Sequence, residues 1–198
     1  MTKGRLEAFS DGVIAIIITI MVLELRTPAG HGLESLRPMA LTFAFYALSF
    51  VFLGIYWVNH HHLFQAIRHV NGAVLWANLA LLFFLSLVPY FTAWMGESHM
   101  APWPTALYGV VFLLSAAAYT VLSLVLIGAH PEHSPLKQAI GSDLKGKASL
   151  VMYAAAIPLA FVMPVASCGL YAAVAILWLI PDRRIERMLA SKGPHAAE

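Results

Sequence analysis

Six apolar segments constrain this chain more than any other feature of its sequence. A helix needs about 20 apolar residues to cross the hydrocarbon of a bilayer, and most of these segments approach that length. Composition agrees, because 60% of the residues are hydrophobic and 11% are charged, whereas about 25% are charged in an ordinary soluble domain. We therefore predict an all-α, polytopic membrane protein with six transmembrane helices, held in the lipid bilayer. The predicted spans lie near 8–26, 38–62, 72–95, 103–129, 148–164 and 165–181.

The last two segments are short and share a break around Pro164. They form either a tight helical hairpin or one bent span. With six spans, ten of the 12 Lys and Arg residues fall on one side of the membrane, and only Arg26 and Arg37 fall on the other. Because positively charged loops stay in the cytoplasm, this asymmetry favours the hairpin and places both termini in the cytoplasm at the cell membrane. Residues 1–182 then form one six-span unit, and 183–198 form a charged cytoplasmic tail.

Several functional classes are disfavoured. Twelve Lys and Arg against ten Asp and Glu give no basic field for nucleic acid. Cys168 is the single cysteine, which excludes an intrachain disulfide and a cysteine-built metal site. No nucleophile–base or metal-ligand motif is visible, so we do not expect an enzyme or a cofactor. Glu24 and Arg26 stand where small neutral residues would precede signal cleavage, so we expect the first span to be retained.

The first span begins with a polar run, residues 5–11, before its apolar stretch from Gly12 to Leu23. That stretch is only roughly 18 Å long as a helix, so its polar flank must enter the depth of the membrane. A carboxylate there is costly and needs shelter from lipid. Asp11 therefore requires a partner, for which Arg5 is the nearest candidate, although other segments could also supply one.

Helical spacing puts a mostly aliphatic stripe on one side of this span, since residues at i, i+4 and i+7 share a face. Starting from Gly12, the stripe carries Ile16, Thr19, Ile20 and Leu23. An ordinary packing face and the lining of a pore both fit this pattern, and spacing alone leaves the two open.

Residues 5–11, Arg-Leu-Glu-Ala-Phe-Ser-Asp, match the RxxxFSD signature at all four fixed positions. The chain therefore resembles the transmembrane protein 175 (TMEM175) family, the lysosomal potassium channels and their shorter prokaryotic relatives. Like the signature in that family, this run stands at the cytoplasmic start of the first span. The length and the six spans resemble a prokaryotic member with one six-span unit.

The resemblance implies a potassium-selective channel that conducts passively, with no cofactor and no metal beyond the permeating K⁺. In the family, the first helix of each unit lines a central pore, and aliphatic residues on it form the constriction with a threonine layer nearby. Animal members look like two fused units, so one-unit chains are expected to form homotetramers. The matching positions here are Ile16, Ile20 and Leu23, with Thr19 as the hydroxyl. They coincide with the stripe, which favours the pore lining over a packing face.

The resemblance also implies that the signature residues form a polar network that fixes the inner end of the pore helix. These residues are Arg5, Ser10 and Asp11, with Phe9 packed beside them. Asn59 and His60, at the end of the second span, are further candidate members. The run His60 to His62 cannot chelate one ion, because consecutive helical residues point about 100° apart.

A proton-coupled transporter that uses Asp11 and the cluster His60 to His62 is the alternative. A relay needs titratable groups spaced across the membrane, whereas these residues gather at one end. The sequence therefore favours the channel.

Overall fold

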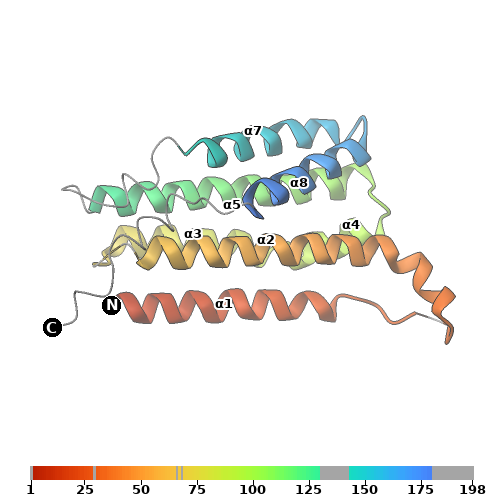
Figure 1. The fold of residues 1–198 in the computed structure, drawn as a ribbon, viewed down its shortest axis with the longest axis horizontal. Coiled ribbons are helices and arrows are strands. Elements are labelled where there is room, and N and C mark those ends of the chain that lie inside the picture. Colours follow the sequence, from red (N-terminus) through yellow and green to blue (C-terminus); the bar gives the residue numbers. More distant parts are fainter. Residues whose placement is uncertain (1, 29, 66, 68, 130–142, 180–198) are drawn as a thin grey trace.

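The fold was analysed in a computed structural model, which describes all residues except 1, 29, 66, 68, 130–142 and 180–198. The described residues form a bundle of roughly parallel and antiparallel helices without strands (Figure 1). The predicted tail 183–198 lies outside the described residues. The helices, in chain order, are α1 (Lys3–Leu23), the short 3₁₀ helix η1 (Leu33–Met39), α2 (Ala40–Gln65), α3 (Gly72–Ser86), α4 (Val88–Glu97), α5 (Pro102–Ala129), α7 (Leu144–Leu159) and α8 (Pro164–Leu179).

Each of the six predicted spans contains helix. Four stretches are long and apolar enough to cross a membrane: α1, η1 with α2, α3 with α4, and α5. The chain is thus a multi-pass, all-α membrane protein. The third span divides at Leu87, where α3 ends and α4 begins. Pro89 in the first turn of α4 has no N–H to donate to the preceding turn, which accounts for the break.

The final pair of spans is a hairpin of two separate helices, which settles the question that the sequence left open. α7 and α8 have 16 residues each and pack against each other. At 1.5 Å per residue each is about 24 Å long, shorter than a full crossing. The turn between them is closed by the Met163 N–H, which donates to the Leu159 carbonyl at 2.7 Å, before Pro164 begins α8.

α1 occupies one edge of the bundle, and α7 lies on the opposite side (Figure 1). α1 packs on α2, α3 and α4, whereas α5 joins α3 and α4 to the α7–α8 hairpin. The start of α1 lies beside the end of α2, because Glu7 and His61 are in contact there. Because Lys3 and Arg5 lie in the first turn of α1, we call this the basic end of the bundle. Arg26 and Glu97 form an ion pair of 2.9 Å at the other end.

The centre of the bundle holds an aromatic cluster from four helices. Phe52 of α2 and Phe112 of α5 have ring centroids 4.4 Å apart, and Tyr108, Tyr153 and Tyr171 complete the cluster. All five side chains are buried. This core fixes α2, α5, α7 and α8 together, and α1 is attached to it through α2, α3 and α4.

Candidate functional site

Two sides of α1 have different surroundings. One side is buried against α2, α3 and α4, and its residues follow helical spacing: Leu6, Ser10, Ile14, Ile17 and Met21. The predicted stripe is on the other side, where Ile16 is 58% exposed, Ile20 is 40% exposed and Leu23 is 78% exposed. Thr19 is exposed as well. The stripe is therefore not the face with which α1 packs inside its own chain.

A buried chain of hydrogen bonds attaches the packed side of α1 to two other helices. The Ser10 hydroxyl donates to the Leu6 carbonyl at 2.9 Å, and the Asn78 amide of α3 donates to Ser10 Oγ at 2.9 Å. Asn78 Oδ1 can only accept, so His60 Nε2 of α2 donates to it at 2.7 Å. Ser10, His60 and Asn78 are fully buried. We call these three residues the anchor triad.

His60 keeps one polar atom without a partner. Its Nδ1 is buried and makes no hydrogen bond to a described residue. Since Nε2 carries the proton given to Asn78, Nδ1 of the neutral ring is an acceptor. The His60 ring also stacks on Phe64, with centroids 4.4 Å apart. In the anchor triad each hydrogen bond is therefore donated in the same direction, from α2 to α3 and from α3 to α1.

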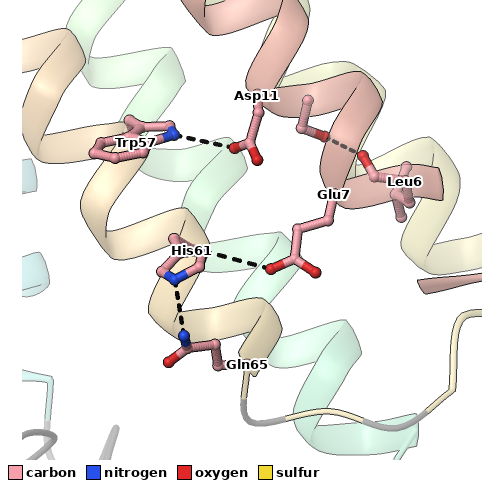
Figure 2. Close-up of polar contacts among 7 residues, drawn as sticks. Leu6, Glu7, Asp11, Trp57, His61 and Gln65 are labelled. Carbon is pink, nitrogen blue, oxygen red and sulfur yellow. Dashed lines mark hydrogen bonds and ion pairs between the residues drawn. The ribbon is translucent and has the colours of Figure 1, made fainter. Parts of the chain in front are cut away.

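Two further contacts connect α1 to α2 beside the triad (Figure 2). The Trp57 indole donates from Nε1 to Asp11 Oδ1 at 3.0 Å. One turn further toward the basic end, His61 Nδ1 faces Glu7 Oε1 at 3.5 Å. The Gln65 amide donates to His61 Nε2 at 2.8 Å, which places the His61 proton on Nδ1, toward Glu7. Asp11 thus receives its partner from α2 and not from Arg5.

The structure brings some of the predicted network residues together and leaves others apart. Ser10, Asp11 and His60 make contacts between helices, as described above. Arg5 is exposed and has no hydrogen bond or ion pair with any described residue. It lies six positions before Asp11, or about 120° away around the helix. Phe9 is 47% exposed, and both residues continue the exposed stripe toward the basic end.

Asn59 also lies outside this network. The Asn59 side-chain amide donates to the Ile55 backbone carbonyl of the same helix at 2.8 Å. The Asn59 backbone carbonyl accepts from the Tyr119 hydroxyl of α5 at 3.2 Å. Because neighbouring helical residues point about 100° apart, Asn59 faces α5 while His60 faces α3. The sequence signal for Asn78 is an amide within an apolar span, which indicates a hydrogen bond between helices but does not identify its partners.

The histidine run forms no metal site in the described part of the chain, where no group of three His, Cys, Asp or Glu side chains is placed to hold an ion. His60 is bonded to Asn78, and His61 lies between Glu7 and Gln65. His62 Nδ1 is buried without a hydrogen bond to a described residue. These three side chains therefore serve different neighbours.

Comparisons with known proteins agree with the signature. The family model described as endosomal/lysosomal potassium channel TMEM175 matches residues 5–89, which include the anchor triad. A protein of Chryseobacterium sp. (strain P1-3), named a potassium channel, is 54% identical over 189 residues, which cover 96% of this chain and 98% of the relative.

Two more distant proteins extend the comparison. A crystal structure, titled as a lysosomal potassium-selective channel TMEM175 homologue from Chamaesiphon minutus, has a TM-score of 0.76 at 28% identity, covering 92% of this chain and 97% of that one. A Gallus gallus protein named endosomal/lysosomal proton channel TMEM175 is 32% identical over 126 residues, 61% of this chain but 24% of the relative. Since 126 residues are 24% of it, that relative is more than twice as long as the 198 residues of this chain.

Proposed function

Because this chain belongs to the TMEM175 channel family, we propose that it conducts potassium ions passively across the cell membrane, through a pore lined by α1 from four identical chains. K⁺ is the permeating ion, and no cofactor or catalytic step is involved. The relative that covers nearly the whole chain is named a potassium channel, and the matching crystal structure is titled potassium-selective. Both names support K⁺ as the ion.

The exposed stripe on α1 is the observation that carries the proposal. A helix at the edge of the bundle presents Ile16, Ile20 and Leu23 outward, although a complete packing face exists on its other side. The two faces have separate uses if the buried one fixes α1 within its unit and the exposed one meets the same helix of other chains around an axis. Four such stripes would form successive rings of aliphatic side chains.

Small residues on the exposed side allow other copies to approach. Ala8, Gly12 and Ala15 are exposed on α1, and a Cβ added at Gly12 would meet nothing within 4 Å. In membranes, helices associate closely through such small residues, because lipid gives no hydrophobic drive between them. Arg5 and Phe9, which have no place inside the unit, would meet neighbouring chains in the assembly.

The chemistry of the stripe fits a hydrophobic gate with one polar layer. A narrow ring of isoleucine and leucine expels water, and an ion that must keep its hydration shell cannot cross it until the ring widens. The Thr19 hydroxyl donates its proton to the Ile16 carbonyl at 2.9 Å. The free lone pairs of its oxygen would then face the pore as acceptors for a cation.

The anchor triad would hold this lining in place. A pore wall made of single helices needs each helix fixed in rotation, because a turn of about 100° replaces the stripe by its neighbours. Ser10, bonded to Asn78 and through it to His60, defines that rotation at the basic end. We assign the basic end to the cytoplasm because Lys3 and Arg5 lie there, whereas Arg26 and Arg37 lie toward the opposite end, and positively charged residues stay inside.

A proton-coupled transporter remains the second candidate, and the name of the Gallus gallus relative, a proton channel, makes proton flux worth measuring. In the described helices, however, Glu7, Asp11 and the histidines of α2 stand together at the basic end. α1 has no Asp, Glu, Lys, Arg or His between Asp11 and Glu24. A relay would need such groups farther along the path.

Flux from liposomes tests the proposal. The purified full-length chain should release K⁺ down its gradient when charge is balanced by an ionophore for another ion, with no imposed proton gradient. Biionic recordings should then give a reversal potential that favours K⁺ over Na⁺. Potassium movement that stops when the proton gradient is removed would establish the transporter instead, and the absence of any cation flux would contradict both.

A further inference from the structure

A pocket lies among α2, α5, α7 and α8, away from α1 and its stripe. It contains about 480 Å³ of space, which includes open solvent at its mouth. Tyr56 and Asn59 of α2, Tyr119 of α5, and Gly146 and Ser149 of α7 are in its wall. The lining residues of α2 run from Phe52, at its middle, to Asn59, and those of α7 from Gly146, in its first turn, to Tyr153, so the pocket extends from the middle of the bundle toward the basic end.

Five aromatic side chains from four helices line this wall. The Tyr56 and Tyr119 rings meet edge to face, with centroids 6.2 Å apart, and the Phe52 and Tyr153 rings are 6.3 Å apart. Trp178 of α8 adds its indole to the same wall. The faces of such rings carry negative electrostatic potential and attract cations, most effectively for tryptophan and tyrosine.

One carboxylate and two free hydroxyls complete the pocket. Asp143 is its single charged lining residue among those described. Asp143 Oδ1 accepts from the Gly146 N–H at 3.0 Å, which leaves Oδ2 without a hydrogen bond to a described residue. The hydroxyls of Tyr56 and Tyr153 also make no hydrogen bond to a described residue, and neither is sealed from the cavity.

From this combination we propose that the pocket binds an organic ammonium ion, with the charged nitrogen among the aromatic faces of Tyr56, Tyr119, Tyr153 and Trp178 and in the field of Asp143. Aromatic walls with one carboxylate favour a methylated or alkylated ammonium, which sheds water readily and contacts ring faces. Bare K⁺ is held by a shell of oxygen atoms that replaces its water, whereas aromatic rings from four helices line this pocket. The free tyrosine hydroxyls would accept from N–H or O–H groups of the ligand.

The pocket is placed to influence the pore helix through α2. Tyr56 and Asn59 line the pocket, whereas Trp57 and His60, the next residue after each, bond to Asp11 and Asn78 on the other side of the same turns. A ligand that orders this part of α2 would therefore act on the helix that holds α1. The ammonium group can come from a soluble amine or from the headgroup of a choline lipid.

Calorimetric titration of the full-length protein in phosphatidylglycerol nanodiscs tests the site without relying on ion flux. Choline should bind saturably, and its neutral isostere 3,3-dimethyl-1-butanol should bind at least about tenfold more weakly, because it lacks the charge. Asp143→Asn should weaken choline binding by about tenfold or more. Asn still caps α7 and tolerates the left-handed backbone at this position, φ 34°, so the variant keeps the local fold.

Glu24→Gln is the matched control, because it removes an exposed carboxylate at the opposite end of α1. It should leave choline binding unchanged. Equal binding of choline and the alcohol by the wild type, equal binding by Asp143→Asn and the wild type, or no saturable choline binding would each overturn the proposal. Loss of binding in Glu24→Gln alone would place choline near Glu24, at the opposite end of α1, and would also overturn the proposal.

Nanodiscs of phosphatidylcholine distinguish the two sources. If the lipid headgroup fills the pocket, free choline should bind more weakly there than in phosphatidylglycerol, and Asp143→Asn should remove that difference. If the pocket takes a soluble amine, choline should bind equally in both lipids while still depending on Asp143. Either result supports the site and assigns its ligand.

Discussion

The side-chain amide of Asn78 donates to the hydroxyl of Ser10 at 2.9 Å, in a position where both residues are fully buried. This bond joins α3 to the signature on α1 and continues through Asn78 Oδ1 to His60 of α2. Three helices thus meet at one amide. The rotation of the proposed pore helix is therefore specified by this directional bond together with the buried apolar face of α1.

Replacing Asn78 by Leu should destabilise the protein by about 1–2 kcal/mol, since it leaves Ser10 Oγ and His60 Nε2 buried without their amide partner. The measurement is reversible unfolding of the purified protein in detergent. Ser86→Ala provides the control on the same helix, because the exposed Ser86 hydroxyl only donates to the Phe83 carbonyl of its own turn. Equal stability of Asn78→Leu and the wild type would show that the triad contributes nothing.

The Trp57–Asp11 contact should appear as a coupling energy between α1 and α2. Trp57→Phe keeps the ring and removes the Nε1 donor that bonds Asp11 Oδ1. A double-mutant cycle of Trp57→Phe with Asp11→Asn should give about 0.5–1.5 kcal/mol, reduced by the partial exposure of both groups. A parallel cycle with Trp76→Phe, an exposed indole on α3, should give none. If both cycles give the same value, the contact has no energetic role.

Gly109 is required by the close approach of α8 to α5. A Cβ at this position would overlap the Tyr171 hydroxyl, which donates to the Thr105 carbonyl at 3.0 Å. Gly109→Ala should therefore cost about 1–3 kcal/mol in the same unfolding assay, and Tyr171→Phe in that background should recover part of it. Gly128→Ala is the control, since its Cβ meets nothing within 4 Å. A neutral Gly109→Ala variant would mean that α8 is free to shift.

Variants at Thr19 test whether the proposed pore has a polar layer or a purely aliphatic lining. Thr19→Val keeps the shape and removes the oxygen that we propose to face K⁺, so K⁺ conductance should fall, while Thr19→Ser, which retains the hydroxyl, should conduct like the wild type. Single-channel recording in symmetric K⁺ measures both. Wild-type conductance in Thr19→Val would remove the hydroxyl from the conduction path.

The sequence predicted the helices well because the membrane imposes a minimum apolar length. The hairpin followed from charge asymmetry, and the two helices on either side of 160–163 agree with it. The break of the third span at Leu87 was less accessible, since a proline in an apolar segment indicates a kink without saying whether the helix resumes.

Partners across helices could not be read from the sequence. Periodicity identifies the side of a helix on which a residue lies, but not which helix stands opposite. Asp11 was therefore assigned Arg5 as its nearest candidate, whereas the tertiary fold supplies Trp57, 46 positions away. Asn59 and His60 were grouped because both stand at the end of the second span, yet adjacent helical residues face different neighbours, here α5 and α3.

The most direct test of the account is the single-channel conductance of Ile16→Asn under biionic K⁺ and Na⁺, beside Leu114→Asn as control. Both residues are exposed and apolar near the middle of their helices, α1 and α5, but only Ile16 belongs to the stripe. If the stripe lines the pore, Ile16→Asn should raise conductance or reduce K⁺ selectivity, because a polar side chain hydrates the constriction, while Leu114→Asn should conduct as the wild type does. Unchanged conductance and selectivity in Ile16→Asn, with the protein correctly assembled, would contradict the assignment of α1 as the pore helix.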